Sequence, residues 1–255
     1  MTKIKAFFFD QDGVIIDTEK DGHRVAFNKT FFHFGFDFQW SVDEYHKLLQ
    51  VGGGKERMRH YLYTKGFGRP VAPDEEDVLI KEMHRFKTDK FIELIENSEM
   101  PLRPGIKRIM EEVKSLGLVL AICTTSNQRA AQAVSKNMLS DIKFDFILAG
   151  DMVSKKKPDP EIYNLALAKT GFTHDECIVI EDSRNGVTAA KAAGMHVVAT
   201  TNFYTQNEDL SAADIVVSCL GVPGGEKGKL TAGCGELDYD GVLNASQLVN
   251  YFNRI

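Results

Sequence analysis

The chain has 255 residues, which is enough for one large domain or two of modest size. Hydrophobic residues make up 43% of the sequence and charged residues 26%, which excludes a mainly disordered or collagen-like chain. The formal net charge of −5 argues against a general nucleic-acid-binding surface, although it is compatible with a local basic site.

The apolar runs and the cysteines indicate where in the cell the protein resides. No apolar run approaches the roughly 18–20 residues of a membrane helix, and the first residues do not resemble a signal peptide. The four cysteines form no CxxC pair, so neither a zinc site nor a disulfide framework is predicted. We therefore expect no membrane partner and a reducing compartment: the cytoplasm, or the plastid stroma if a transit peptide has been removed.

The first predicted element is a strand over residues 5–9, where an uninterrupted apolar run indicates burial on both faces of a sheet. Residues 18–97 contain no comparable run and show apolar residues at roughly helical spacing instead. A stretch of this length is too long for a loop in a compact domain. It therefore predicts an all-helical domain inserted after the first strand.

Residues 98–220 alternate between strands and helices. Strands are predicted at 118–123, 144–149, 177–180, 196–199 and 215–217, with helices over 106–113, 160–170 and 187–193 between them. This alternation predicts βαβ units and a parallel sheet. The expected fold class is α/β, with a doubly wound, Rossmann-like core of residues 1–17 and 98–255 and a helical cap of residues 18–97. The Gly-rich segment 221–241 is predicted to be a surface loop, before an amphipathic segment over 243–252.

Polar residues that suit phosphoryl transfer follow four consecutive predicted strands, at the edge where open parallel sheets bind ligands. Carboxylates can attack phosphorus and hold Mg²⁺, while a lysine and hydroxyls can neutralise and orient a phosphate. Each feature alone has an ordinary explanation, such as a helix cap or a solvated turn, but their ordered appearance favours a site. The residues are Asp10 and Asp12 after the first strand, Thr124, Thr125 and Ser126 after the second, Lys157 after the third, and Glu181 and Asp182 after the fourth.

In this interpretation Asp10 forms an aspartyl phosphate, and Asp12 protonates the leaving alkoxide before activating water. Mg²⁺ is the expected cofactor, held by the carboxylates of Asp10 and Asp182 and most simply by the backbone carbonyl of Asp12. Lys157 supplies a fixed positive charge and Thr124 a hydrogen-bond donor. The helix that opens after residue 127 offers backbone N–H groups to the phosphate.

The motifs resemble those of the haloacid dehalogenase-like phosphatases over residues 3–220. FDQDGVIIDTE at 9–19 is similar to the first motif, Thr124 to the second, KPDPEIY at 157–163 to the third and EDSRNG at 181–186 to the fourth. Gln11 stands where hydrophobic residues are frequent in the family. The resemblance implies that residues 18–97 form the family's helical cap. It implies these site residues: Asp10 as nucleophile, Asp12 as general acid and base, Thr124 and Lys157 on the phosphate, and Asp10, Asp12, Glu181 and Asp182 around Mg²⁺.

Within the family, several segments resemble the CbbY-like branch: Glu19 with Gly22-His23-Arg24, Tyr45, GGGKER at 52–57 and Phe203-Tyr204-Thr205. This resemblance implies hydrolysis of xylulose-1,5-bisphosphate. Lys55, Arg57 and Arg59 place three cations within five residues, a cluster that suits a second phosphate, although exposed helix charges are the alternative. We expect a small sugar phosphate as the partner and a monomeric protein. The expected specificity residues are Glu19, His23, Arg24, Tyr45, Gly54, Lys55 and Arg57 in the cap, with Thr125 and Ser126 in the core.

Three other functions compete with a phosphatase. In mutases of this family a histidine lies four residues after the cap-entry threonine, whereas here Thr18 leads to Gly22 at that spacing and His23 comes one residue later. A phosphorelay receiver would leave the long insertion after the first strand unexplained. A catalytically inactive binding module is disfavoured because no expected catalytic position is substituted.

Overall fold

The computed structural model describes residues 4–51, 54–97, 99–233, 237 and 239–254. The chain divides into two compact units: unit 1 consists of Met1–Asp17 and Pro101–Ile255, and unit 2 of Thr18–Met100. No helix in the described part of the chain is both long and apolar enough to span a bilayer.

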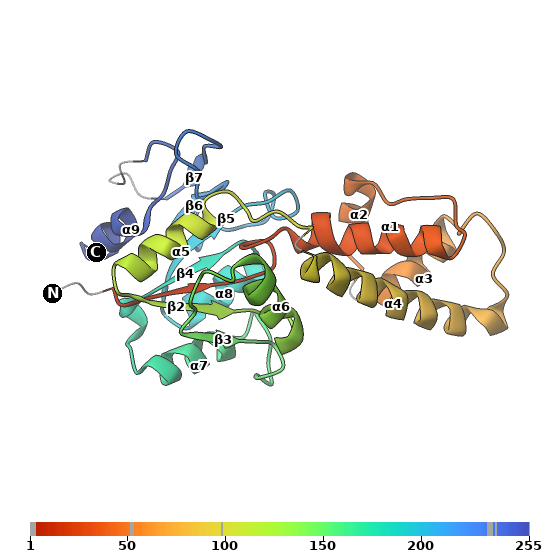
Figure 1. Cartoon of the computed structure of the whole chain (residues 1–255), viewed down its shortest axis with the longest axis horizontal. Helices are drawn as coiled ribbons and strands as arrows, with labels where there is room; N and C mark the ends of the chain where they lie inside the picture. Colours follow the sequence, from red (N-terminus) through yellow and green to blue (C-terminus); the bar gives the residue numbers. More distant parts are fainter. Residues whose placement is uncertain (1–3, 52–53, 98, 234–236, 238, 255) are drawn as a thin grey trace. The chain divides into compact units, whose positions relative to one another are not determined.

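Unit 1 is built on a sheet whose described strands follow the order β3-β2-β1-β4-β5-β6-β7 (Figure 1). The first six strands in this order run parallel, as expected from the alternation of strands and helices. The strands are β1 (Ala6–Phe9), β2 (Val119–Cys123), β3 (Phe146–Leu148), β4 (Cys177–Glu181), β5 (His196–Thr200), β6 (Ile215–Val217) and β7 (Leu230–Ala232).

Strand β1 lies in the interior of this sheet, between β2 and β4. Its four residues are buried, which agrees with its unbroken apolar sequence. Phe9 lies opposite Ile122 of β2 and opposite Ile180 of β4. The carboxyl ends of these three strands therefore lie at the same edge of the sheet.

Helices cover both faces of the sheet. Helices α7 (Glu161–Thr170) and α8 (Arg184–Ala192) pack with Phe8 in one buried cluster. The buried residues of α5 (Ile106–Ser115) and α9 (Ala245–Phe252) lie outside that cluster, and these two helices lie side by side on the opposite face (Figure 1). Helix α6 (Gln128–Met138) follows β2, and a 3₁₀ turn (His174–Glu176) leads into β4.

Strand β7 corrects the prediction of an irregular loop over 221–241. It pairs antiparallel with β6, with Val217 opposite Leu230. All three residues of β7 are exposed, so the segment lacks the apolar pattern by which the other strands were predicted. Its pairing with an existing sheet edge, rather than its own sequence, makes it a strand.

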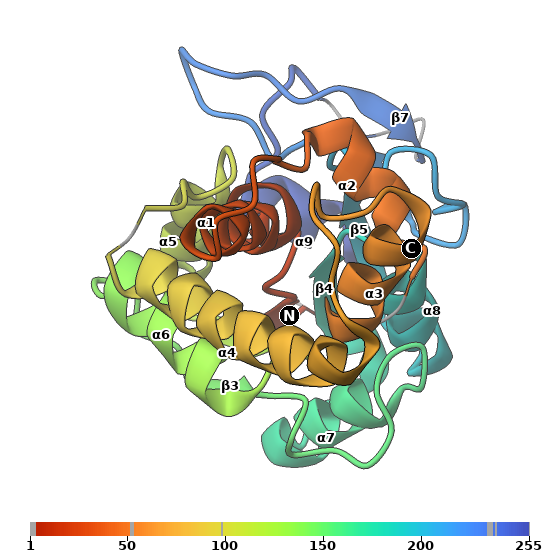
Figure 2. The same ribbon diagram turned by 90° about the vertical axis from the view of Figure 1, so that its right-hand side faces the viewer.

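Every regular element among the described residues of unit 2 is a helix, as predicted. A π-helical turn (Thr18–His23) leads into α1 (Arg24–His33), which lies beside the long α4 (Pro73–Glu96) in both views (Figures 1 and 2). Between them come α2 (Val42–Leu48) and α3 (Gly54–Thr64). An aromatic core holds the unit together, with the ring centroids of Phe27 and Phe31 at 4.8 and 4.7 Å from that of Trp40.

The two points where the chain leaves and re-enters unit 1 are bonded to each other. Ile16 and Leu102 form an antiparallel bridge. Next to it, the backbone N–H of Arg103 donates to the carbonyl of Ile15 at 2.9 Å. The two segments that flank the insertion are thus paired within unit 1.

Candidate active site

The ammonium group of Lys157, in the connection after β3, joins the ends of three strands. Its Nζ lies 2.6 Å from Oδ1 of Asp10 and 2.6 Å from Oε1 of Glu181, and donates to the carbonyl of Cys123 at 2.9 Å. The Lys157 side chain is only 6% exposed. Although burial opposes protonation, the two carboxylates raise the pKa of Lys157 above its usual value, so the lysine is charged.

The carboxyl groups of this cluster have pKa values raised by burial, which disfavours their charged form. Burial raises the pKa of Asp10 to about 8, against the lowering effect of Lys157, and the charges of Glu181 and Asp12 add to the rise. Burial, followed by the charge of Glu181, also raises the pKa of Asp182 well above its usual value. Negative charge is therefore concentrated here beyond what one ammonium group neutralises, which is the environment that a divalent cation stabilises.

Three of the predicted metal residues lie together. One carboxylate oxygen each from Asp10, Glu181 and Asp182 lies within 4.8 Å of the others. Such an all-oxygen donor set suits Mg²⁺. Gly13 shapes the site, because a Cβ atom there would lie 2.0 Å from Oδ2 of Asp182. Only glycine lets the loop after β1 approach the carboxylate this closely, so the residues present fit a divalent metal.

The carboxylate of Asp12 has different partners. Its Oδ2 accepts hydrogen bonds from Oγ of Ser126 at 2.5 Å and from Oγ1 of Thr124 at 3.4 Å. Within the part of the chain that the structure describes, Asp12 does not belong to the group of metal-ligating carboxylates. Its expected contribution to a metal is thus limited to its backbone carbonyl, and its carboxylate is held beside the ends of β1 and β2.

The start of α6 is more occupied than predicted. Asn127 caps the helix, with its Oδ1 accepting from the N–H of Ala130 at 2.9 Å. The N–H of Gln128 donates to Asp151 at 3.2 Å, and the carbonyl of Thr125 accepts from Lys156 at 3.2 Å. The bonds of the Ala130 and Gln128 N–H groups leave fewer free backbone donors for a phosphate than the sequence suggested.

Two residues that the sequence analysis gave no role support the carboxylates. Tyr163 donates through its hydroxyl to Oε1 of Glu181 at 2.6 Å, and Asn202 donates through Nδ2 to Oδ2 of Asp182 at 2.7 Å. Tyr163 ends the third motif, and Asn202 follows β5. Extending the search of strand ends to this fifth strand would have found Asn202.

In unit 2, Tyr45 links two other predicted residues. Its hydroxyl donates to Oε2 of Glu19 at 2.6 Å and accepts from Nη1 of Arg57 at 2.9 Å. Arg57 is buried and also donates to the carbonyl of Leu48 at 3.0 Å. Arg59 instead forms ion pairs with Glu76 and Asp77. The three cations expected to act as one cluster therefore have separate environments.

His23 lies beside a lysine that the sequence analysis missed. The Nζ of Lys87 lies 2.8 Å from Nδ1 of His23, and the His23 ring lies tilted against that of Phe91 at a centroid distance of 3.9 Å. Burial, helped by the charges of Lys87 and Arg57, lowers the pKa of His23 well below its usual value, so a neutral imidazole accepts from the ammonium. Burial also lowers the pKa of Lys87 to about 8. The sequence signal that could have identified Lys87 is its helical spacing: it lies one turn from Met83 and one turn from Phe91, which are both buried in α4.

Of the remaining predicted residues of unit 2, Arg24 and Gly54 contact other parts of the unit, whereas Lys55 is partly exposed. Arg24 donates to the carbonyls of Lys20 and Trp40, at 3.1 and 3.3 Å. Gly54 begins α3 against the ring of His84, 3.0 Å from where its Cβ would be, and Lys55 beside it is partly exposed. Residues 52 and 53, which directly precede Gly54, lie outside the described residues.

Comparison with known proteins places this arrangement in context. Residues 4–194 match the haloacid dehalogenase-like hydrolases. The chain is 44% identical to a CBBY-like protein of Arabidopsis thaliana over 236 residues, covering 91% of this chain and 74% of the relative. It is 38% identical to Protein CbbY of Cereibacter sphaeroides over 229 residues, covering 88% and 96%. A crystal structure of a CbbY mutant from Rhodobacter sphaeroides, in complex with xylulose-1,5-bisphosphate, is similar with a TM-score of 0.67 and 39% identity, covering 87% of this chain and 98% of that one.

Proposed function

The chain belongs to the haloacid dehalogenase-like hydrolases, as a phosphatase of sugar phosphates, and on this premise we propose that it hydrolyses xylulose-1,5-bisphosphate with Mg²⁺ through an aspartyl-phosphate intermediate. The observation that carries the mechanism is the contact of Lys157 with both Asp10 and Glu181, at 2.6 Å each. The relative that binds xylulose-1,5-bisphosphate supports the choice of substrate.

In the first half-reaction, a carboxylate oxygen of Asp10 attacks phosphorus and the bond from phosphorus to the sugar oxygen breaks. Asp12 gives its proton to the leaving alkoxide. In the second, Asp12 takes a proton from water as the water oxygen attacks the aspartyl phosphate, which releases inorganic phosphate and restores Asp10. Ser126 and Thr124 hold the Asp12 carboxylate in place for both transfers.

Positive charge is the other requirement of this reaction. Lys157 places a buried ammonium beside the nucleophile, where it stabilises charge that develops on the phosphoryl oxygens. A divalent cation held by Asp10, Glu181 and Asp182 would add Lewis-acid stabilisation and oppose the raised pKa of Asp10. Tyr163 and Asn202 keep two of these carboxylates in a fixed orientation.

Phosphate release from a panel of pentose and hexose mono- and bisphosphates, with Mg²⁺ and with EDTA, tests the activity. We expect xylulose-1,5-bisphosphate to give the highest kcat/KM and EDTA to abolish turnover. Asp10→Asn should reduce kcat by at least about a thousandfold, because an amide cannot form the acyl phosphate. Asp37→Asn, at an exposed aspartate of unit 2, is the matched control and should retain wild-type activity. Isomerisation of a hexose 1-phosphate without phosphate release would instead identify a mutase.

We also propose that unit 2 recognises the second phosphate of the substrate. Lys55 is the cation of the predicted cluster that is neither buried nor in an ion pair among the contacts of the described residues. Lys55→Ala should raise KM for the bisphosphate about tenfold or more, the loss expected for one charge-assisted contact, with little effect on a monophosphate. Arg59→Ala is the control, because Arg59 already pairs with Glu76 and Asp77. An equal rise in KM for both substrates would remove Lys55 from the distal phosphate.

A further inference from the structure

Arg103 makes an unusual set of contacts in unit 1. Its Nη1 donates to the carbonyl of Gly13, and to the carbonyl and hydroxyl of Thr200 at 3.2 and 3.0 Å. Its Nη2 donates to the carbonyls of Thr201 and Ser218, at 2.5 and 3.0 Å. All five acceptors are carbonyl or hydroxyl oxygens. One guanidinium group therefore ties together the loop after β1 and the ends of β5 and β6.

These acceptors lie on both sides of the Asp182 carboxylate. Gly13 approaches it so closely that a Cβ atom would lie 2.0 Å from Oδ2 of Asp182 and 2.9 Å from Nδ2 of Asn202. Asn202, which directly follows Thr201, donates to the same Oδ2 at 2.7 Å. Arg103 thus holds the backbone of the two segments between which this carboxylate lies.

We propose that Arg103 is a positioning residue for the divalent cation, because it fixes the orientation of Asp182 through Gly13 and through the Thr201–Asn202 backbone. This inference rests on the metal-dependent mechanism proposed above. Arg103 touches neither the substrate nor the reacting atoms in this mechanism. The planar guanidinium is needed because it presents several N–H groups in a fixed fork, which the single ammonium of a lysine does not do.

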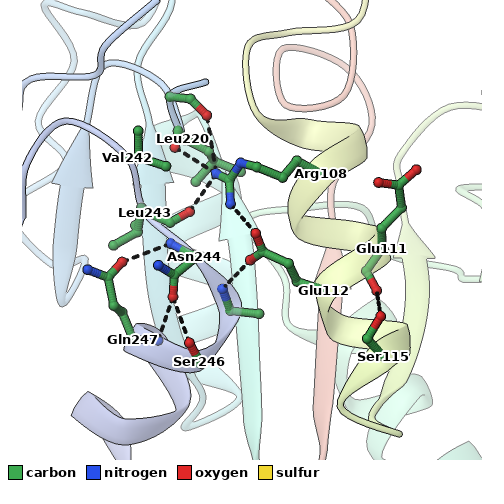
Figure 3. Close-up of polar contacts among 12 residues, drawn as sticks. Arg108, Glu111, Glu112, Ser115, Leu220, Val242, Leu243, Asn244, Ser246 and Gln247 are labelled. Carbon is green, nitrogen blue, oxygen red and sulfur yellow. Dashed lines mark hydrogen bonds and ion pairs between the residues drawn. The ribbon is translucent and has the colours of Figure 1, made fainter. Parts of the chain in front are cut away.

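Arg108 provides a matched control on the neighbouring helix. It also donates to backbone carbonyls, those of Leu220, Gly221 and Leu243 at 3.0, 3.1 and 2.8 Å (Figure 3). Its Nη1 pairs with Glu112, whose other oxygen accepts from the first N–H of α9. Arg108 therefore clamps the C-terminal helix in the same chemical manner, but its acceptors do not flank a metal-binding carboxylate.

Mn²⁺ binding can be measured from the decrease in the electron paramagnetic resonance signal of the free ion. This measurement distinguishes the role of Arg103 from that of Arg108 without relying on turnover. Arg103→Gln should weaken Mn²⁺ binding by about tenfold to a hundredfold, the usual effect of losing a residue that orients a metal ligand. Arg108→Gln should lower the melting temperature but leave Mn²⁺ binding unchanged. In steady-state assays Arg103→Gln should need correspondingly more Mg²⁺ for half-maximal kcat, with KM for the substrate unchanged at saturating Mg²⁺.

Arg103→Lys tests geometry against charge and is available if Arg103→Gln does not fold. It keeps the positive charge but loses the fork, so we expect weakened Mn²⁺ binding here as well. Wild-type Mn²⁺ affinity in either Arg103 variant, or equal weakening in Arg108→Gln, overturns the inference. A wild-type protein that hydrolyses sugar phosphates without binding Mn²⁺ or needing Mg²⁺ contradicts the proposed metal mechanism itself, and with it the role of Arg103.

Discussion

Lys157 and Lys87 are both buried, and their partners give their pKa values opposite shifts. Lys157 contacts two carboxylates at 2.6 Å, which outweigh its loss of solvation and raise its pKa. Lys87 has a neutral histidine at 2.8 Å and the rings of Phe27 and Phe91 at 4.9 and 5.2 Å. Burial therefore prevails and lowers its pKa to about 8, with Glu19 opposing and Arg57 adding to the effect.

The pKa of Lys87 makes stability depend on pH in a defined direction. Between pH 8 and its usual pKa of 10.5, the unfolded chain binds more protons at this site than the folded protein. The free energy of unfolding should therefore rise with pH across this window, by up to about 3 kcal/mol for a shift of this size. Urea unfolding of wild type and Lys87→Met at pH 7 and pH 9.5 measures it, and the variant should lack this component of the rise.

Lys90 on the same helix provides the control. It is partly exposed and pairs with Glu93, so Lys90→Met should keep the wild-type dependence on pH. If Lys87→Met and wild type show the same change in unfolding free energy between the two pH values, Lys87 is not desolvated as described.

Position relative to strand ends made Asp10, Lys157, Glu181 and Asp182 predictable from the sequence. Each follows an apolar run, and parallel strands bring their carboxyl ends to one edge. Lys87 and Arg103 were not predictable in this way. The environment of Lys87 depends on how α4 packs beside α1, and the acceptors of Arg103 come from three separate loops. The helical spacing from Met83 and Phe91 indicates that Lys87 is buried, but the contacts of both residues are set by tertiary structure.

At the scale of elements, the packing of α8 against the end of β4 determines the position of Glu181. A Cβ atom at Gly186, in the first turn of α8, would lie 1.9 Å from Oε2 of Glu181. Glu181 cannot move aside easily, because it is fully buried and bonded to Lys157 and Tyr163. Glycine at this helical position therefore allows close contact between the helix and the carboxylate.

Gly186→Ala should consequently destabilise the protein by about 1–3 kcal/mol, as overpacked interiors do. The sign is informative, because the same change in an open helical position stabilises by roughly 0.5–1 kcal/mol. We also expect a lower kcat and weaker Mg²⁺ activation, since Glu181 is displaced. Thermal unfolding and Mg²⁺ titration of activity measure both effects. Asn185→Ala, at the exposed neighbouring position, should change neither, and a Gly186→Ala protein as stable and active as wild type would contradict the close packing.

Elements differed in how far the sequence determined them. The strands of the sheet centre and the helices α5, α7 and α8 were predictable, because long apolar runs and Gly or Ser at the helix ends act locally. Ser183, for example, caps α8 by accepting from the N–H of Gly186 at 3.2 Å. Strand β7 was not predictable, since three exposed residues become a strand only by pairing with β6.

At the scale of the whole molecule, the acidic net charge of −5 averages over unlike regions. Unit 1 concentrates carboxylates at one sheet edge, whereas unit 2 buries the cations Arg57 and Lys87. The charge of the chain alone therefore says little about its ligand. The local distribution agrees with an anionic small molecule and a metal ion better than with a polymeric partner.

The paired segments at Ile16 and Leu102 have a consequence for the modularity of the chain. Because they are already neighbours in unit 1, an Asn-Gly turn could join Asp17 to Pro101 in place of residues 18–100. We expect the shortened protein to unfold cooperatively, to bind Mn²⁺ and to hydrolyse p-nitrophenyl phosphate, while losing its preference for bisphosphates. Failure to fold or to bind the ion would show that unit 1 needs the insertion to form its folded, metal-binding structure. If the shortened protein folds and is active, this junction is a site at which the inserted domain can be replaced by another while the catalytic unit is kept.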